Sequence, residues 1–458
     1  MESKLSLEIE SKLSEHSFSI DELIIKTKIL FEKEGMVGFL GLLIMLLDNR
    51  ISPNWITILE NYRKNQPTKN KKHYCCSKPK FVRCDRPEKT LITSIGKLVF
   101  KWTRMRCTNC DKTLIPLREF FGIDKYQRKS SELEKIVTEV ISEQSYRRTS
   151  AHLETIGGIP VPRTTLHRWV MKSDCDEINP SKKRVETLIA DGTGYKRRPP
   201  KDDPEDNRGE IKLVVGIAKD GTVIPYGAWA DISWRKIGTT IKKGNHPNKK
   251  LKFVPVANIL VSDGEEGLIK GLDPVVMQKQ RCLWHVVHDL PASLRYKDEA
   301  PLDETRRTQK ELATIIDIDL PEKDFEFVTM EDKLLLSTEI WKAEKGIEDL
   351  AASLRAKGYK KACNYLRNAK DSMFNYLRVW MKNGVVTPKV SSMVERMMRE
   401  IGRRIKKIGF GWSEAGAAKM TRIIIKRITS ADEWTEYWNK RLRILGAVEL
   451  KFIGVSEC

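Results

Sequence analysis

The chain has no hydrophobic run long enough to suggest a membrane span. Its most apolar segment, MVGFLGLLIMLLDNR from Met36, holds about a dozen apolar residues before Asp48. A membrane-spanning helix needs about 20, so this segment is predicted to form a buried helix. The first residues, MESKLSLEIESK, are polar and acidic, unlike the basic and then apolar pattern of a secretory signal peptide. No membrane partner is therefore expected.

Cysteine is also sparse and irregularly placed. Nine cysteines are spread over 458 residues, without the even framework of a disulfide-stabilised secreted domain. This pattern indicates a protein that works in a reducing interior.

Acidic residues are in short supply relative to basic ones. The chain has 62 Asp and Glu against 83 Lys and Arg, a net charge of +21. The basic residues cluster: 63–112 holds fifteen of them against three acids, and 396–407 holds six against Glu400. Clustered positive charge is typical of proteins that bind nucleic acid.

Composition and periodicity divide the chain into six parts. The region 301–388 lacks strand signals and has helical periodicity. The predicted parts are an N-terminal helical packing or oligomerisation region (1–66), a zinc-ribbon-like β module (67–122), a helix-turn-helix (123–180), the first part of a catalytic core (181–300), an all-α insertion (301–388) and the C-terminal helices of the core with a tail (389–458).

The β module carries a possible zinc site. Cys107-Thr-Asn-Cys110 has the spacing by which two thiolates share one zinc ion on a tight turn. Cys84 and one of Cys75 or Cys76, with Cys76 preferred, are expected to complete the site. A β module that has lost its metal is the alternative.

Three short helices are predicted after the β module. Ser131 and Ser145 are expected to cap the first two, and Pro162 to open the third. The start of a recognition helix contacts base edges in the major groove, although three packed helices without a DNA role are an alternative. The candidate DNA contacts are Arg163, Thr164, Thr165, His167 and Arg168.

From Arg184 the periodicity changes to that of strands. The runs VETLIADG, IKLVVGIAKDG, TVIPYGAWADI and VANILVSDG are separated by turn signals, with a hairpin at Asp220-Gly221. Asp191 and Asp263 are expected to end the first and last of these strands. This order predicts an α/β RNase H-like core.

A third acid, Glu395, lies on a later basic helix. Three carboxylates that meet at a sheet edge suit Mg²⁺ or Mn²⁺, which prefer hard oxygen ligands, and two such ions can catalyse phosphoryl transfer. The acids that compete with these three are Asp231, Glu265, Glu266 and Glu400.

The motifs ADGTGY, VVGIAKDG, VSDGEEGL, RCLWH and GWS-x-x-G occur in this order. In this respect the chain resembles the DDE transposases of the Mutator-like group, found in bacterial and archaeal insertion sequences. The resemblance implies a metal-binding triad of Asp191, Asp263 and Glu395. It also implies a C-x-x-H motif, Cys282 to His285, with His285 orienting a carboxylate or phosphate at the active site.

The resemblance further implies partners and a location. The DNA partners would be terminal inverted repeats and target DNA, bound by a homodimer or a larger synaptic assembly in a prokaryotic cytoplasm, at the nucleoid. Arg396, Arg399 and Arg403 would lie along the phosphate backbone. A nuclease without strand transfer, and an inactive DNA-binding protein derived from a transposase, are the alternatives.

Overall fold

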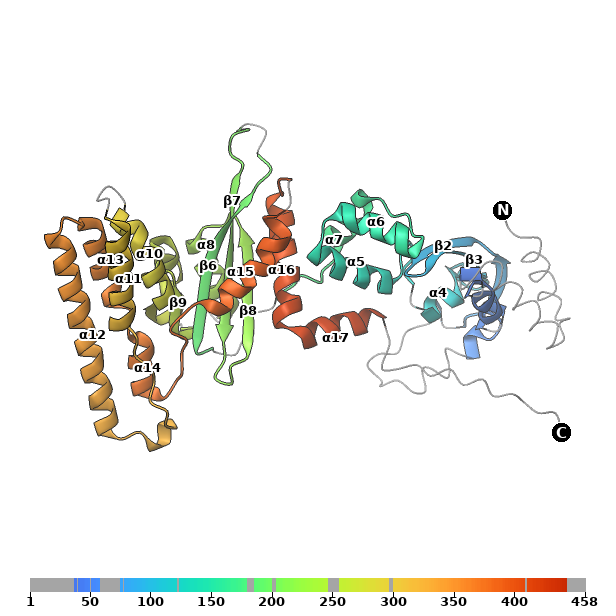
Figure 1. Cartoon of the computed structure of the whole chain (residues 1–458). Helices are drawn as coiled ribbons and strands as arrows, with labels where there is room; N and C mark the ends of the chain where they lie inside the picture. The colour runs from blue at the N-terminus through green and yellow to red at the C-terminus, as the bar shows by residue number, and fades with distance from the viewer. Residues whose placement is uncertain are drawn as a thin grey trace, which may run out of the picture. The chain divides into compact units, whose positions relative to one another are not determined.

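The described part of the chain forms two compact units. One comprises Met1–Val170 with Trp438–Cys458, and the other comprises Met171–Tyr437 (Figure 1). The computed structural model describes residues 37–38, 40–49, 51–57, 75–76, 78–121, 123–178, 185–199, 203–245, 255–295, 300–407 and 410–442. The predicted helical region 1–66 lies largely outside these ranges. No helix within them is long and apolar enough to cross a membrane.

Five short strands of the first unit form two small sheets. Strands β1, β4 and β5 make one antiparallel sheet, and β2 and β3 make a hairpin. The segment 67–122, predicted to form a β module, therefore contains β-strands. The bounds are Phe81–Asp85 (β1), Glu88–Thr93 (β2), Gly96–Lys101 (β3), Arg104–Cys107 (β4) and Thr113–Leu114 (β5), with helix α4 at Pro116–Phe121.

The apolar segment before this module packs against the hairpin. Residues 40–49 are helical, and apolar side chains of this helix contact a core that includes Leu98 and Phe100. The carboxylate of buried Asp48 accepts hydrogen bonds from the backbone N–H and the hydroxyl of Thr103, at 2.9 and 2.7 Å. The helix and the β module thus share one core, although the sequence suggested two separate parts.

Three helices follow, as predicted, with a turn between the second and third. The hydroxyls of Ser130 and Ser145 accept hydrogen bonds from the first-turn N–H groups of the first two helices. The first cap is thus Ser130, one residue before the predicted Ser131. Gly158, with a φ of +57°, ends the second helix in the left-handed conformation that glycine favours. The bounds are Ser131–Glu143 (α5), Tyr146–Gly157 (α6) and Arg163–Lys172 (α7).

The second unit is built on a five-stranded mixed sheet in the order β10-β9-β6-β7-β8. Strand β7 is antiparallel to β6 and β8, while β9 is parallel to β6 and β10. The predicted hairpin turn at Asp220-Gly221 is confirmed, since Gly221 has a φ of +82°. The bounds are Thr187–Lys196 (β6), Arg208–Ile217 (β7), Val223–Ala230 (β8), Ala257–Ser262 (β9) and Val276–Arg281 (β10).

Helices cover both faces of this sheet. Helices α8 (Trp234–Asn245) and α9 (Glu266–Leu272) pack over the face that presents Leu188 and Ala190. Helices α15 (Ser392–Ile405) and α16 (Glu414–Thr429) also contact the sheet. Their buried residues lie outside the α8–α9 core. This places them over the other face, to which Ile189 points because side chains alternate along a strand.

The segment between the sheet and α15 is all helical, as predicted for 301–388. Its helices share one hydrophobic core with α10, and Gln280 of strand β10 attaches them to the sheet. The buried Gln280 amide donates to the carbonyl of Met373 at 2.6 Å and accepts from the N–H of Tyr376 at 2.9 Å. The remaining bounds are Asp273–Val275 (η2), Leu283–Arg295 (α10), Leu302–Ile315 (α11), Phe325–Phe327 (η3), Met330–Ala356 (α12), Lys360–Lys370 (α13), Asn375–Asn383 (α14) and Ala431–Leu442 (α17).

A pair of glycine substitutions tests the packing of α8 on α9. A Cβ at Gly238 would lie 2.1 Å from the carbonyl oxygen of Gly271, so Gly238→Ala is expected to destabilise the protein by about 2 kcal/mol. Gly244 of the same helix has no atom within 4 Å of such a Cβ. Gly244→Ala is therefore expected to be neutral or to stabilise by up to about 1 kcal/mol. Urea unfolding of both variants measures the difference, and equal stabilities would contradict the close contact.

Candidate active site and metal centres

Asp191 and Asp263 lie at the same level on neighbouring parallel strands. Ile189 of β6 pairs with Val261 of β9, and each aspartate follows two residues later. Both carboxylates therefore leave the sheet on the face of Ile189. Asp263 follows the last residue of β9, as predicted, but β6 does not end at Asp191. It continues to Lys196 along β7, and only its pairing with β9 stops at Ile189.

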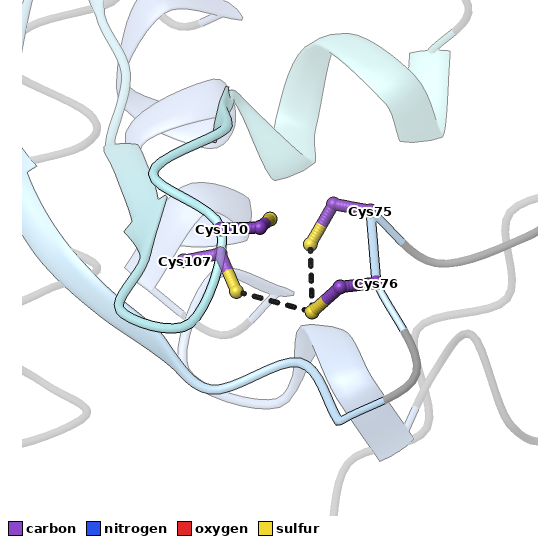
Figure 2. Close-up of side chains that lie close together, drawn as sticks. All are labelled: Cys75, Cys76, Cys107 and Cys110. Atoms are coloured by element: carbon purple, nitrogen blue, oxygen red, sulfur yellow. Dashed lines mark hydrogen bonds between the residues drawn. The ribbon is translucent and has the colours of Figure 1, made fainter.

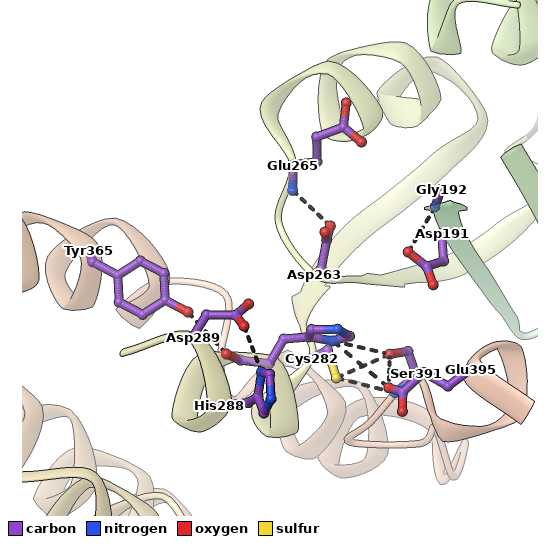
Figure 3. A network of polar contacts seen from close by, with 11 residues as sticks. Asp191, Gly192, Asp263, Glu265, Cys282, His288, Asp289, Tyr365, Ser391 and Glu395 are labelled. Carbon is purple, nitrogen blue, oxygen red and sulfur yellow. Dashed lines mark hydrogen bonds and ion pairs between the residues drawn. The ribbon is translucent and has the colours of Figure 1, made fainter. Parts of the chain in front are cut away.

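Glu395 approaches these two aspartates from helix α15. The residue lies in the first turn of the helix, after Ser391, and the helix contacts β6. The Glu395 side chain is 29% exposed. Figure 3 shows the three acids on their three separate elements.

The pKa of Asp191 reflects the approach of these acids. Burial is the main cause that raises this pKa to about 6, and the charges of Asp263 and Glu395 raise it further. The N–H of Gly192, which donates to Oδ1 at 2.8 Å, and the charge of His285 act in the opposite direction. A partly buried carboxylate among like charges is the kind of group that a bound cation stabilises.

Ser391 connects Glu395 to the C-x-x-H motif. Its hydroxyl lies 3.0 Å from Oε1 of Glu395, 3.3 Å from Sγ of Cys282 and 3.4 Å from Nδ1 of His285. Its backbone N–H donates to the same sulfur at 3.3 Å. The sequence marked Ser391 only as the start of a helix. The contact of Ser391 with Cys282 joins residues 109 apart in the chain, so no local sequence pattern predicts it.

Cys282 and His285 form a polar pair beside Glu395. The hydrogen bond with Cys282 raises the pKa of His285 to about 9, although burial lowers it. Burial also raises the pKa of the Cys282 thiol, but hydrogen bonds with His285 and Ser391 outweigh it and lower that pKa. The motif itself offers two side chains, and the structure adds Glu395, whose carboxylate lies within 4.8 Å of both.

The competing acids are all held by partners of their own. The pairs are Glu400 with Arg403 (2.7 Å), Glu265 with the indole N–H of Trp234 (3.0 Å), Asp231 with the hydroxyl of Tyr195 (2.7 Å) and Glu266 with Lys270. Asp191, Asp263 and Glu395 are not among the groups of the described chain whose ligand atoms all lie within 4.8 Å of one another. They stay the predicted set, linked by strand register and by the charges that Asp263 and Glu395 exert on Asp191.

Four cysteines of the β module gather into a cluster. The sulfurs of Cys75, Cys76, Cys107 and Cys110 all lie within 4.8 Å of one another, as Figure 2 shows. Cys84 is exposed and lies outside this cluster, so the expected ligand set is corrected by replacing Cys84 with Cys75.

The pairing of β1 with β4 explains why Cys84 is remote. Phe81, the first residue of β1, pairs with Cys107, and Cys84 lies three residues further along. A strand rises about 3.3 Å per residue, which separates Cys84 from the cluster by roughly 10 Å.

The spacing of the sulfurs fits one tetrahedral zinc ion. Zinc–sulfur bonds of about 2.3 Å place tetrahedral sulfurs about 3.8 Å apart. The Cys76 sulfur lies 3.7 Å from that of Cys107 and 4.0 Å from that of Cys75. Burial raises the pKa of Cys107, but N–H groups of Asn109 and Lys80 outweigh it and lower this pKa to about 6. The cluster is thus compatible with a structural zinc ion.

The candidate DNA contacts on α7 lie on its solvent side. Leu166 and Val170 are buried and turn the opposite side of the helix to the core. Thr165 is partly buried. The exposed candidates are Arg163, Thr164, His167 and Arg168.

The basic residues of α15 line a second exposed surface. Arg396, Arg399 and Arg403 are exposed and follow one another at helical spacing. Trp412, the tryptophan of the GWS-x-x-G motif, is 4% exposed and stacks on Arg404, at 4.7 Å from its guanidinium carbon. Its role in this fold is to pack the end of α15.

Comparison with known proteins does not assign the chain. No family model matches it, and no curated protein does. Among solved structures, the Drosophila P element transposase strand transfer complex aligns with a TM-score of 0.23 and 12% identity, over 68% of this chain and 81% of that one. A likeness of that size carries no argument, so the functional conclusion rests on the site.

The cysteine cluster predicts which substitutions release zinc. Purified protein is expected to hold one zinc ion, since four thiolates complete a tetrahedral site. Cys107→Ser should lose this ion and unfold at a lower temperature, whereas Cys84→Ser on the same module should keep it. Metal analysis combined with a chromogenic chelator measures the stoichiometry. Zinc retained by Cys75→Ser but lost by Cys84→Ser would overturn the ligand set.

The raised pKa of Asp191 predicts a pH-dependent gain from its removal. Its folded-state pKa is about 6 against an ordinary 3.8, so the carboxylate lowers stability as pH rises between these values and remains costly above them. That difference corresponds to about 3 kcal/mol as an upper limit. Without metal, Asp191→Asn is therefore expected to be more stable than wild type at neutral pH, and equally stable near pH 3.8.

Divalent metal should reverse this order of stability. Mg²⁺ or Mn²⁺ is expected to raise the unfolding temperature of the wild type and to leave that of Asp191→Asn unchanged, because ligand binding stabilises only the state that binds. Calorimetry with and without EDTA measures both effects. An equal response of the two proteins to metal would rule out Asp191 as a ligand.

Proposed function

We propose that the protein is a divalent-metal-dependent DNA transposase of the Mutator-like DDE group. One observation carries the proposal. Asp191 and Asp263 lie at one level on neighbouring parallel strands, and the negative charge of Glu395, from a distant helix, acts on the same carboxylate. Metal-assisted phosphoryl transfer requires carboxylates that converge on one site from separate elements.

The sheet supports an RNase H-like core. Numbered along the unit, the strand order is 5-4-1-2-3, with the first three strands antiparallel and the fourth and fifth parallel to the first. Such a core carries one acid on its first strand, one after its fourth and one on a helix that follows. The order of the motifs along the chain agrees with this arrangement.

Asp191, Asp263 and Glu395 would hold Mg²⁺ or Mn²⁺ in this site. Bound metal would make an attacking oxygen more nucleophilic and would stabilise the leaving oxygen. The chain's own residues position the reactants. Ser391 fixes Glu395 through a 3.0 Å hydrogen bond, and His285 adds positive charge 3.9 Å from the same carboxylate.

The reaction would begin with strand cleavage and end with strand transfer. Water would attack the phosphodiester at the element's end and free a 3′-OH, and this 3′-OH would then attack target DNA in the same site. Positioning supplies much of the rate of such steps. The exposed cations of α15 would neutralise the phosphate backbone beside Glu395.

Recognition of the terminal inverted repeats is assigned to the first unit. Helix α7 presents Arg163, Thr164, His167 and Arg168 to solvent, which suits insertion into a major groove. Zinc in the cysteine cluster would stabilise the adjoining β module. Joining two DNA ends requires two active sites, so a homodimer or larger assembly is proposed.

Glu395→Gln is the decisive variant, with Glu400→Gln as its matched control. Glu400 lies on the same helix but is paired with Arg403. On labelled DNA that carries the sequences flanking the gene, Glu395→Gln is expected to lower cleavage and joining at least 1,000-fold in Mg²⁺ or Mn²⁺, since a metal ligand is lost. Glu400→Gln should retain activity, and both should still bind DNA.

The possible outcomes separate the alternatives. Cleavage without joining by the wild type would indicate a nuclease. Binding without cleavage would indicate an inactive DNA-binding protein. Cleavage that survives in Glu395→Gln but disappears in Glu400→Gln would show that the third acid has been misassigned.

A further inference from the structure

Strand β10 ends in an arginine whose guanidinium lies against the turn that follows Asp263. Arg281 is the last residue of this strand and lies one residue before the C-x-x-H motif. Its backbone N–H donates to the carbonyl of Ser372 at 2.9 Å, and the preceding Gln280 is bonded to the same helical insertion. The backbone from which this side chain starts is thus held from two sides.

The guanidinium packs directly onto the residue that follows Asp263. A Cβ built on Gly264 would lie 0.9 Å from Nη1 of Arg281 and 1.9 Å from Cζ. The side chain therefore fills the space that every residue other than glycine would occupy. Gly264 also has a φ of +90°, which glycine adopts with least strain. Glycine at position 264 therefore allows this turn and leaves room for the Arg281 guanidinium beside it.

The helical insertion contacts the Arg281 side chain through Tyr365. The guanidinium carbon of Arg281 lies 5.5 Å from the centre of the Tyr365 ring on α13, a distance at which an aromatic face attracts a cation. The hydroxyl of Tyr365 lies 3.2 Å from the carbonyl of His285 and 3.4 Å from that of Val286. The ring is therefore fixed between Arg281 and the C-x-x-H motif.

The charge of Arg281 has no acidic partner in the described chain. Its buried Nε has no hydrogen-bond partner there, and no carboxylate in the described ranges forms an ion pair with its guanidinium. Lys279, two residues earlier, differs in that its Nζ lies 2.6 Å from Asp273. The guanidinium of Arg281 makes a side-chain hydrogen bond with Tyr365. Without a carboxylate partner its remaining donors match the paired oxygens of a phosphate.

We propose that Arg281 is a catalytic residue that contacts a non-bridging oxygen of the scissile phosphodiester and neutralises its charge. The inference rests on the proposed function and deepens it, because it adds a protein cation to a site otherwise built of acids. Tyr365 is then a positioning residue, and through it the helical insertion contributes to the chemistry.

A substrate lacking the phosphate charge tests this role. The substrate is a DNA end that the wild type cleaves, carrying either the natural phosphate or one methylphosphonate at the mapped cleavage position. On the natural phosphate, Arg281→Ala is expected to lower the single-turnover rate about 100-fold, as when one preorganised donor is removed. On the methylphosphonate, the two proteins should differ by less than about threefold, since no charge remains to neutralise.

Two further variants keep the test independent of folding. Arg281→Lys should recover part of the rate on the natural phosphate, because it restores the charge without the paired donors. Lys279→Ala, on the same strand, should stay within about twofold of wild type, because the charge of this half-buried lysine is already paired with Asp273. Thermal unfolding of all variants checks that the fold is kept.

Different results would contradict the proposed function and the proposed role of Arg281. A wild type that cleaves no DNA in Mg²⁺ or Mn²⁺ removes the proposed function and the role of Arg281 together. A wild type that cleaves while Arg281→Ala is equally fast removes only the role of Arg281. An equal loss on phosphate and methylphosphonate would show that Arg281 acts through the fold and does not touch the phosphate.

Discussion

The pairing register of β6 with β9 is the constraint on which the site depends. Pairing of Ile189 with Val261 brings Asp191 level with Asp263, and a slip of one residue would turn one carboxylate to the opposite face. The register is fixed because Leu188 and Leu260 must enter the core beneath α8 and α9. Hydrophobic burial on one face of the sheet thus determines that the two aspartates lie on the other face.

Bringing like charges together in a buried place opposes folding, and the surrounding groups offset part of that cost. One N–H, from Gly192, reaches the Asp191 carboxylate, and His285 contributes positive charge. Ser391 binds Glu395 and Cys282 at once, so the start of α15 is linked to the end of β10. If the proposed site binds a cation, these contacts hold its side chains in place beforehand, which would limit reorganisation during the reaction.

The sequence predicted well what local patterns determine and poorly what distant contacts determine. Alternation and turn residues indicated the strands of Asp191 and Asp263, and helical periodicity indicated the helix of Glu395. No sequence pattern indicates that Phe81 pairs with Cys107, the pairing that excludes Cys84 from the cysteine cluster. No sequence pattern indicates the burial of Trp412 either, because it depends on the contact with Arg404. Such contacts follow from packing that only the folded chain provides.

The helical insertion is part of the architecture of the site. Strand β10 lies at the edge of the sheet, where unpaired backbone groups are a liability that proteins commonly cover. Here the loop before α14 accepts the N–H of Arg281, and Asn375 donates to the carbonyl of Lys279 at 2.6 Å. Because the C-x-x-H motif continues directly from this strand, the placement of His285 beside Glu395 depends on the same contacts. A long insertion between Asp263 and Glu395 is tolerated because it covers the edge strand of the sheet that carries Asp191.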